Sequence, residues 1–181
     1  MQAQEIDKLV EQILFYARSN STEKDYFIKQ YMVEDLVHQS MIHYKDLILL
    51  EKISIEIEEM SSIIFMDEKW FSFILNQIIG NAIKYKKEND AKITISCIEN
   101  ENQIVLEIED NGTGIKTEEL SRVFEKGFTG TNRQKKNATG MGLYLVKKLC
   151  DNLQLGVSID SVYQEHTKVS IVFPKGNMHQ L

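Results

Sequence analysis

Apolar residues alternate with polar ones in five separate segments of this 181-residue chain, and this alternation limits the possible folds more than any other feature. The alternating sets are Ile53, Ile55 and Ile57; Ile93, Ile95 and Cys97; Ile104, Leu106 and Ile108; Leu155, Val157 and Ile159; and Val169, Ile171 and Phe173. A two-residue period puts alternate side chains on opposite faces of a strand. These segments therefore predict strands of a sheet that is buried on one face.

Three other segments have the helical period of three to four residues. They run from Val33 to about Leu50, from about residue 67 to 86, and from about residue 142 to 153. Helices and strands in this order predict an α+β fold, a two-layer α/β sandwich with a mixed sheet of about five strands and helices on one face. Residues 100–102 are expected to form a hairpin turn between two strands.

A further amphipathic helix is predicted over residues 5–19. Its apolar positions share one face and are Ile6, Leu9, Ile13, Tyr16 and Ala17. A helix this short is marginally stable alone, so its apolar face needs a partner in this chain or in another. Polar residues interrupt the pattern from Ser19 to Thr22. We expect one unit over residues 1–20, a linker over 21–30 and the main domain over 31–181.

Charge and composition exclude several classes of protein. The chain has 21 Lys and Arg residues against 27 Asp and Glu residues, a net charge of -6, whereas nucleic-acid binders usually present a basic surface. Cys97 and Cys150 are far apart in the sequence, which argues against a disulfide framework and a zinc cluster. The sequence shows no apolar run of the ~20 residues that cross a bilayer, and residues 1–12 are too polar for a signal peptide. A soluble intracellular chain without a nucleic-acid partner is the expectation.

Asn81 lies in a helical segment whose other residues should be buried. Ile78 and Ile83 flank it, and a polar amide among such residues needs a partner. Lys84 and Tyr85 follow one turn later on the same side. The amide oxygen would suit a metal ion and the ammonium group a phosphate. An ordinary surface or helix-bending asparagine is the alternative.

Residues 110–115, Asp-Asn-Gly-Thr-Gly-Ile, come directly after the strand predicted at 104–108. Gly112 and Gly114 allow positive φ and close approach of the backbone. Asp110 presents a carboxylate acceptor at the strand end, and an exocyclic amine would be a suitable donor. A plain tight turn is the alternative, because Asp-Asn-Gly is also a favoured turn sequence.

Two more glycine-containing segments precede or open the last predicted helix. Residues 124–128 read Phe-Glu-Lys-Gly-Phe, and residues 139–143 read Thr-Gly-Met-Gly-Leu. Backbone N–H groups and the helix dipole attract anions at a helix N-terminus, so Gly140 and Gly142 suggest a phosphate site. Each segment alone is also what an ordinary loop or helix start contains.

Four cations occur between residues 126 and 139 without any acid among them: Lys126, Arg133, Lys135 and Lys136. A solvated basic loop is one interpretation. A bound triphosphate would offset the repulsion between these like charges, and this is the interpretation that the surrounding glycine segments favour. The polar helix, the Asp-Gly turn, the basic segment and the glycine-rich helix start together predict a nucleotide site.

These four segments resemble the N box, first glycine box, F box and second glycine box of the ATP-binding domain of sensor histidine kinases. That fold class also includes DNA gyrase and MutL. The resemblance covers about residues 30–175 and is most similar to the short-sensor kinases of Gram-positive bacteria that work with antimicrobial-peptide transporters. It implies ATP and Mg²⁺ as ligands, a response regulator, the protein's own dimerisation hairpin and a transporter as partners, and a cytoplasmic domain of a bacterial cell-membrane protein.

The resemblance also implies roles for single residues. Asn81 would ligate the Mg²⁺ that bridges the phosphates, Lys84 would approach the phosphates, and Tyr85 would lie near the adenosine. Asp110 would accept from the adenine amine. The other implied nucleotide-binding residues are Gly112, Gly114 and Ile115 at the base; Phe124 and Phe128, which anchor a lid; Thr139, Gly140, Gly142 and Leu143, which close it; and Arg133, Lys135 or Lys136 at the terminal phosphate.

The chain departs from the family pattern in its histidines. Such kinases carry the phosphoacceptor histidine, followed by an acid, on the first helix of a dimerisation hairpin. None of His38, His43, His166 and His179 has that setting. Residues 1–20 resemble the second hairpin helix alone, so we expect an excised fragment of a protein-histidine kinase that does not phosphorylate itself.

Two other functions stay open from the sequence. One is a free-standing kinase of the same fold that phosphorylates a partner protein on serine, as anti-sigma factors do; the amphipathic N-terminal helix argues against it. The other is a degenerate nucleotide-sensing module, against which the intact Asn81, Asp110 and both glycine boxes argue.

Overall fold

The computed structural model describes residues 10, 13–14, 26–130 and 139–177. Most of the helix predicted over residues 5–19 lies outside these residues. The elements in chain order are β1 (Lys29–Met32), α2 (Val33–Leu50), β2 (Ser54–Ile57), β3 (Ile63–Met66), α3 (Glu68–Lys84), β4 (Lys92–Glu99), β5 (Gln103–Asp110), α4 (Thr117–Leu120), α5 (Gly142–Asn152), β6 (Gly156–Val162), β7 (His166–Pro174) and a 3-10 turn, η1 (Lys175–Asn177).

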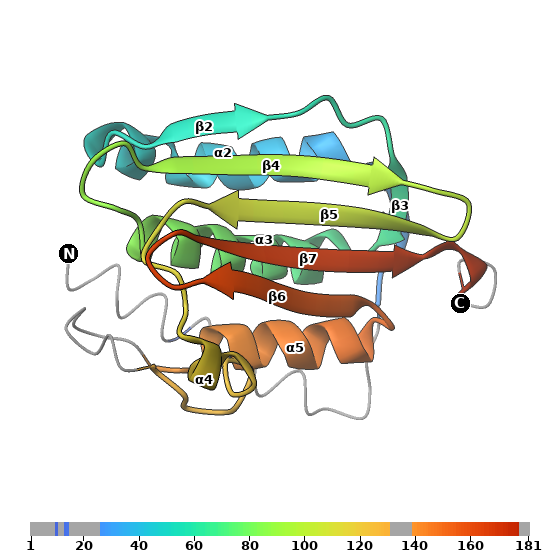
Figure 1. Cartoon of the computed structure of the whole chain (residues 1–181). Coiled ribbons are helices and arrows are strands. Elements are labelled where there is room, and N and C mark those ends of the chain that lie inside the picture. Colours follow the sequence, from blue (N-terminus) through green and yellow to red (C-terminus); the bar gives the residue numbers. More distant parts are fainter. Residues whose placement is uncertain (1–9, 11–12, 15–25, 131–138, 178–181) are drawn as a thin grey trace.

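The main sheet has five strands in the order β2-β4-β5-β7-β6 (Figure 1). β2 pairs with β4 in parallel, and the other neighbours are antiparallel, so the sheet is mixed as predicted. The turn predicted at residues 100–102 joins β4 to β5. There the Asn100 side-chain oxygen accepts from the backbone N–H groups of Asn102 and Gln103, at 2.9 and 3.0 Å.

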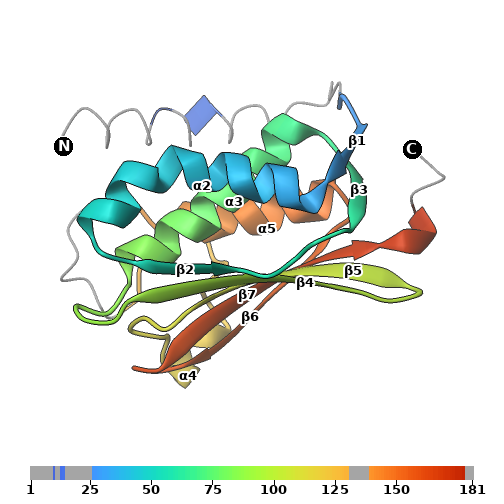
Figure 2. The same cartoon turned by 90° about the horizontal axis from the view of Figure 1, so that it is seen from above.

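Helices α2, α3 and α5 cover one face of this sheet, which confirms the predicted two-layer sandwich (Figure 2). The covered face carries the alternating apolar residues, with Ile95, Leu106 and Ile171 fully buried. Strands need this alternation because their opposite face meets water. On that outer face the Lys168 ammonium lies 3.1 Å from the Glu109 carboxylate. None of the described helices is both long and apolar enough to cross a membrane.

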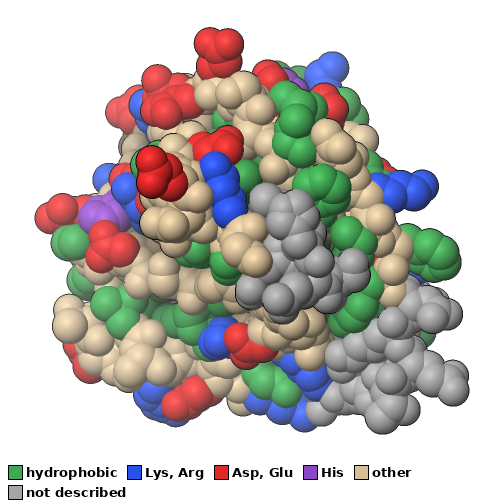
Figure 3. All heavy atoms as spheres, turned by 90° about the vertical axis from the view of Figure 1, so that its right-hand side faces the viewer, with side chains coloured by type: hydrophobic (Ala, Val, Ile, Leu, Met, Phe, Trp, Pro, Cys, Tyr) green, Lys and Arg blue, Asp and Glu red, His purple; other side chains and the backbone are tan. Residues whose placement is uncertain are grey.

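A second, two-stranded sheet was not expected from the sequence. β1 pairs with β3 antiparallel, so residues 29 and 30 of the predicted linker belong to a strand. Four-residue strands give too few positions for a clear period. Hydrophobic side chains gather on the side of the molecule that carries β3 (Figure 3). On β3, Ile63 and Phe65 are exposed, at 40% and 46%.

Asp67 fixes the start of α3. Its Oδ1 accepts from the backbone N–H groups of Lys69 and Trp70, at 3.0 and 3.3 Å, so it caps the first turn. Its Oδ2 accepts from the N–H of Phe27 at 2.9 Å. One buried carboxylate thus joins the chain before β1 to the N-terminus of the central helix.

We expect Asp67→Ala to lower the free energy of unfolding by about 1–2 kcal/mol, because it leaves the helix N-terminus uncapped. Denaturant unfolding followed by circular dichroism measures this. Asp46→Ala, at an exposed position of α2, is the matched control and should change stability by less than about 0.5 kcal/mol. Equal stability of the two variants would contradict the capping role.

Candidate functional site

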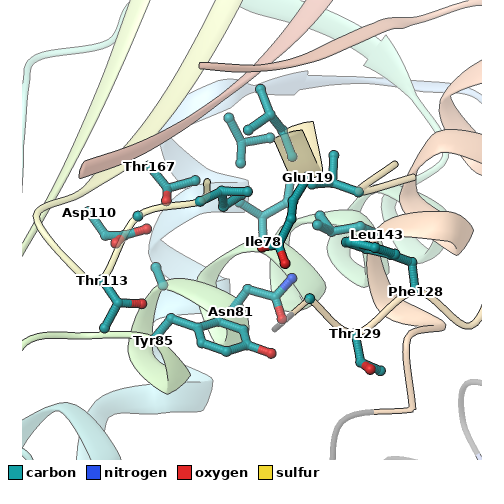
Figure 4. A pocket seen from close by; sticks show the side chains of 17 residues that line it. Ile78, Asn81, Tyr85, Asp110, Thr113, Glu119, Phe128, Thr129, Leu143 and Thr167 are labelled. Carbon is teal, nitrogen blue, oxygen red and sulfur yellow. The ribbon is translucent and has the colours of Figure 1, made fainter. Parts of the chain in front are cut away.

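One pocket brings seven of the predicted site residues together. It lies between α3, the segment 110–130, the start of α5 and the inner face of β6 and β7, and it has an empty volume of ≈ 860 Å³, part of which is open to solvent (Figure 4). The predicted site residues that line it are Asn81, Tyr85, Asp110, Gly114, Ile115, Phe128 and Leu143. Segments that are far apart in the sequence therefore meet at one site.

Asp110 is the last residue of β5 and is only 7% exposed. Its Oδ1 accepts from the N–H of Gly112 at 2.9 Å. Burial raises the pKa of this carboxyl from 3.8 to about 7, and the charge of Glu109 adds to the rise. The Gly112 bond and His166 act in the opposite direction. The pocket thus contains a buried acid that a ligand able to donate a hydrogen bond would stabilise in its ionised form.

The loop that follows Asp110 is tied to both layers of the fold. The N–H of Thr113 donates to the carbonyl of Tyr85, at the end of α3, and the N–H of Gln164 donates to the carbonyl of Thr113, at 2.9 and 2.8 Å. Gly114 has φ +61°, and a Cβ there would overlap with the carbonyl of Val162. Only glycine fits that close passage, which is the physical reason for the second glycine of residues 110–115.

Asn81 and Tyr85 enter the pocket from successive turns of α3 (Figure 4). Because the Asn81 side chain lines the pocket, its amide can reach a ligand bound there. Lys84, which was grouped with them, does not line the pocket; its ammonium lies 5.5 Å from the centroid of the Tyr85 ring. The helical period explains this, because Lys84 is turned away from positions 78, 81, 82 and 85.

The glycine-rich segments meet beside the pocket. The N–H of Gly127 donates to the carbonyl of Gly140 at 3.0 Å. Gly140 has φ +65°, and a Cβ there would overlap with the backbone of Gly127. Phe128 lines the pocket, and the Arg122 guanidinium lies 4.7 Å from the centroid of its ring. Phe124 is half-buried but does not line the pocket.

The first turn of α5 has the chemistry of an anion site. Gly142 begins the helix, no side chain caps it, and its first turn contains no acid. The Thr139 hydroxyl accepts from the N–H of Met141 at 3.3 Å. Unpaired N–H groups at such a terminus favour a bound anion. Arg133, Lys135 and Lys136, the predicted partners of the terminal phosphate, lie outside the described residues.

The sequence analysis missed several residues that line the pocket. The polar ones are Thr113, Glu119, Thr129 and Thr167, and the apolar ones include Ile78, Ala82, Val123, Ile159 and Val169. Thr167 is the cross-strand partner of Asp110, because β5 pairs with β7. No local pattern reports that pairing, so Thr167 could have been found only after the strand order was known.

The fold and this pocket agree with comparisons to known proteins. A family model described as histidine kinase-, DNA gyrase B- and HSP90-like ATPase matches residues 66–177, and this range includes the four segments that form the pocket. The chain belongs to this family. The match supports ATP binding by this domain.

The relatives are sensor kinases. Sensor protein BceS of Halalkalibacterium halodurans is 34% identical over 173 residues, which are 95% of this chain and 51% of BceS. Sensor histidine kinase GraS of Staphylococcus haemolyticus is 31% identical over 95% of this chain and 50% of GraS. The chain therefore spans about half the length of these relatives.

Solved structures show the same fold. Histidine kinase AdeS of Acinetobacter baumannii superposes with a TM-score of 0.78 at 21% identity, covering 97% of this chain and 81% of AdeS. Full-length ShkA in complex with AMPPNP has a TM-score of 0.77 at 19% identity, covering 91% of this chain and 35% of ShkA. These two likenesses support the fold of the ATP-binding domain.

The stability of the nucleotide-free domain should depend on pH through Asp110. Below about pH 4 the carboxyl is protonated in the folded and unfolded states alike; between pH 4 and 7 only the unfolded state ionises, so stability falls as pH rises, and above pH 7 the loss is constant. Asp110→Asn removes this loss. Its free energy of unfolding relative to the parent should rise by about 1.4 kcal/mol per pH unit between pH 4 and 7.

Denaturant unfolding at several pH values tests this expectation. Asp46→Asn, at an exposed position, is the control and should keep a constant difference from the parent. A constant difference for Asp110→Asn would show that the carboxyl ionises normally in the folded domain.

Proposed function

We propose that the chain is the catalytic, ATP-binding part of a two-component sensor histidine kinase. The observation that carries the proposal is the meeting of Asn81 and Asp110 in one largely apolar pocket, beside the uncapped N-terminus of α5. A nucleoside triphosphate needs a group that recognises its base, a ligand for its metal ion and a site for its phosphates. The Asp110 carboxylate, the Asn81 amide and the start of α5 would supply these three.

Asp110 would read the base. An exocyclic amine donates to an ionised carboxylate, and this bond would offset part of the cost of burying the charge. Ile78, Ala82 and Ile159 supply apolar surface for the ring faces. Adenine carries an amine where guanine carries a carbonyl, so the pocket favours adenine nucleotides.

Asn81, the other polar residue of this proposal, would bind Mg²⁺. No cluster of three or more His, Cys, Asp or Glu side chains that could hold a metal is found among the described residues, and Mg²⁺ commonly takes few protein ligands together with phosphate oxygens and water. The Asn81 amide oxygen is a suitable ligand. The N–H groups at the start of α5 would hold phosphate oxygens, with Thr139, Gly140, Gly142 and Leu143 around them. Arg133, Lys135 and Lys136 are proposed to act at the phosphates, and Lys84, which does not line the pocket, is proposed to approach the phosphates from outside it.

The proposed reaction transfers the terminal phosphoryl group of ATP to a histidine. We propose that this histidine belongs to a dimerisation hairpin, of which residues 1–20 are the second helix, and that a response regulator then receives the group on an aspartate. The relatives BceS and GraS support this assignment by their names as sensor kinases. A cytoplasmic position in a membrane-bound kinase, and a peptide transporter as a further partner, are proposed on the same likeness.

Asn81→Ala should remove the effect of Mg²⁺ on nucleotide binding. In the parent, calorimetry should show that Mg²⁺ raises ATP affinity, because the metal neutralises phosphate charge and binds the Asn81 amide oxygen. Asn89→Ala, in an exposed loop, is the matched control and should keep the effect. Retention of the Mg²⁺ effect in Asn81→Ala would contradict the metal assignment.

Incubation with radiolabelled Mg-ATP should leave this chain unlabelled but label a histidine-bearing dimerisation hairpin supplied from a relative such as BceS. The label on the hairpin should be acid-labile, and Asn81→Ala should reduce it. Acid-labile label on His38 or His43, which are exposed on α2, would instead show a stand-alone kinase. Acid-stable label on a serine of a partner would support the anti-sigma type of activity.

A further inference from the structure

A buried hydroxyl on β6 hydrogen-bonds to the loop that carries Asp110. Ser161 is 7% exposed, and its Oγ accepts from the backbone N–H of Ile115 at 2.9 Å. The same Oγ donates to the carbonyl of His166 at 2.6 Å and lies 3.1 Å from the Oγ1 of Thr167. One hydroxyl therefore joins β6, the start of β7 and the loop after β5.

Counting protons fixes the direction of the bond between the two hydroxyls. A serine hydroxyl has one proton to donate and two lone pairs that accept. The His166 carbonyl can only accept, so it takes the Ser161 proton. Ser161 must then act as acceptor toward Thr167 as well as toward Ile115. The Thr167 proton consequently points to Ser161, and the free lone pairs of Thr167 are left as acceptors.

Thr167 is also beside the base-reading acid. Asp110 pairs with Thr167 across β5 and β7, and Thr167 pairs with Ser161 across β7 and β6, so the three residues form a row over three strand ends. Thr167 and Asp110 both line the pocket, where they lie next to one another (Figure 4). Two adjacent acceptors would face any group bound there.

We propose that Ser161 is a positioning residue for base selection: it holds the Thr167 hydroxyl as an acceptor, so that this side of the pocket takes an amine and rejects a carbonyl. The proposal rests on the proposed function, in which the pocket binds an adenine nucleotide. A carbonyl at the same place would face the acceptors of the buried Asp110 and the half-buried Thr167, and a site built to bond a donor rejects an analogue that lacks it.

A simpler role for Ser161 would be to anchor the loop through Ile115 alone. That role would weaken all nucleotides equally, because loop position matters to every base. Whether the Thr167 hydroxyl accepts or donates affects only the ligand group at the position of the adenine amine. The two roles therefore differ in how Ser161 affects the ratio of affinities for two bases.

The test compares Mg-ADP with Mg-IDP, whose hypoxanthine carries a carbonyl in place of the adenine amine. Calorimetry at pH 8, where Asp110 is ionised, should show that the parent prefers ADP. Ser161→Ala frees the Thr167 proton to point into the pocket. The ratio of the affinity for ADP to the affinity for IDP should therefore fall by about tenfold. Ser158→Ala, on the exposed face of the same strand, should leave the ratio unchanged.

Thr167→Val gives a second test of the Thr167 hydroxyl, in a variant that keeps Ser161. It removes the hydroxyl but keeps the shape of the side chain, and it should also narrow the ratio. If Ser161 acts through Thr167, Ser161→Ala should narrow the ratio no further in a Thr167→Val background, as a double-mutant cycle can show.

Three results would overturn the proposal: an equal loss of ADP and IDP affinity in Ser161→Ala, an unchanged ratio in Thr167→Val, or fully additive effects in the cycle. If Ser161→Ala does not fold, Thr167→Val still tests the acceptor that Ser161 is proposed to hold, and an unchanged ratio of affinities in that variant overturns the proposal. Failure of the parent to bind ADP would overturn the proposed function itself. If the parent binds ADP but the ratio of ADP to IDP affinity does not change in the variants, only the role of Ser161 is overturned.

Discussion

The burial of one sheet face under three helices is the constraint on which the rest of this domain depends. The same two-residue period that buries Ile104, Leu106 and Ile108 continues to Asp110, so β5 delivers a carboxylate into the apolar layer. The site is therefore an extension of the core, made where the strands of the sheet end and the helices leave a gap. A shift of β5 by one residue would expose Asp110 and bury Glu109, and it would destroy core and site together.

A buried acid opposes stability, and the surrounding structure shows how the cost is limited. The Gly112 N–H supplies one hydrogen bond to Asp110, and the loop after it is held by α3 on one side and the turn between β6 and β7 on the other. These hydrogen bonds hold the Asp110 carboxyl in position, but they do not cancel the rise of its pKa that burial causes. In the empty domain, ionising Asp110 costs free energy because the carboxyl is buried. A bound amine that donates to the carboxylate would remove part of this cost, and the affinity for that amine would be higher as a result.

Much of the fold could be predicted from the sequence, because periods of two and of about 3.6 residues are local signals. All five strands of the main sheet and helices α2, α3 and α5 were predicted in this way. The β1–β3 pair was missed because four residues such as 29–32 carry no clear period, and their pairing joins distant segments. At the site, Asp110 and Asn81 stood out because polar residues in apolar segments are locally visible. Thr167 and Ser161 did not, since their importance depends on which strands are neighbours.

The double use of Asp67 has a mechanical consequence. Its carboxylate holds both the backbone at Phe27 and the first turn of α3, and α3 is a continuous helix that ends at the pocket with Asn81 and Tyr85. A force on the backbone at Phe27 would therefore reach the first turn of α3 through this carboxylate, and α3 leads on to the pocket. This connection between Phe27 and the pocket lies in the helical layer and does not include the sheet.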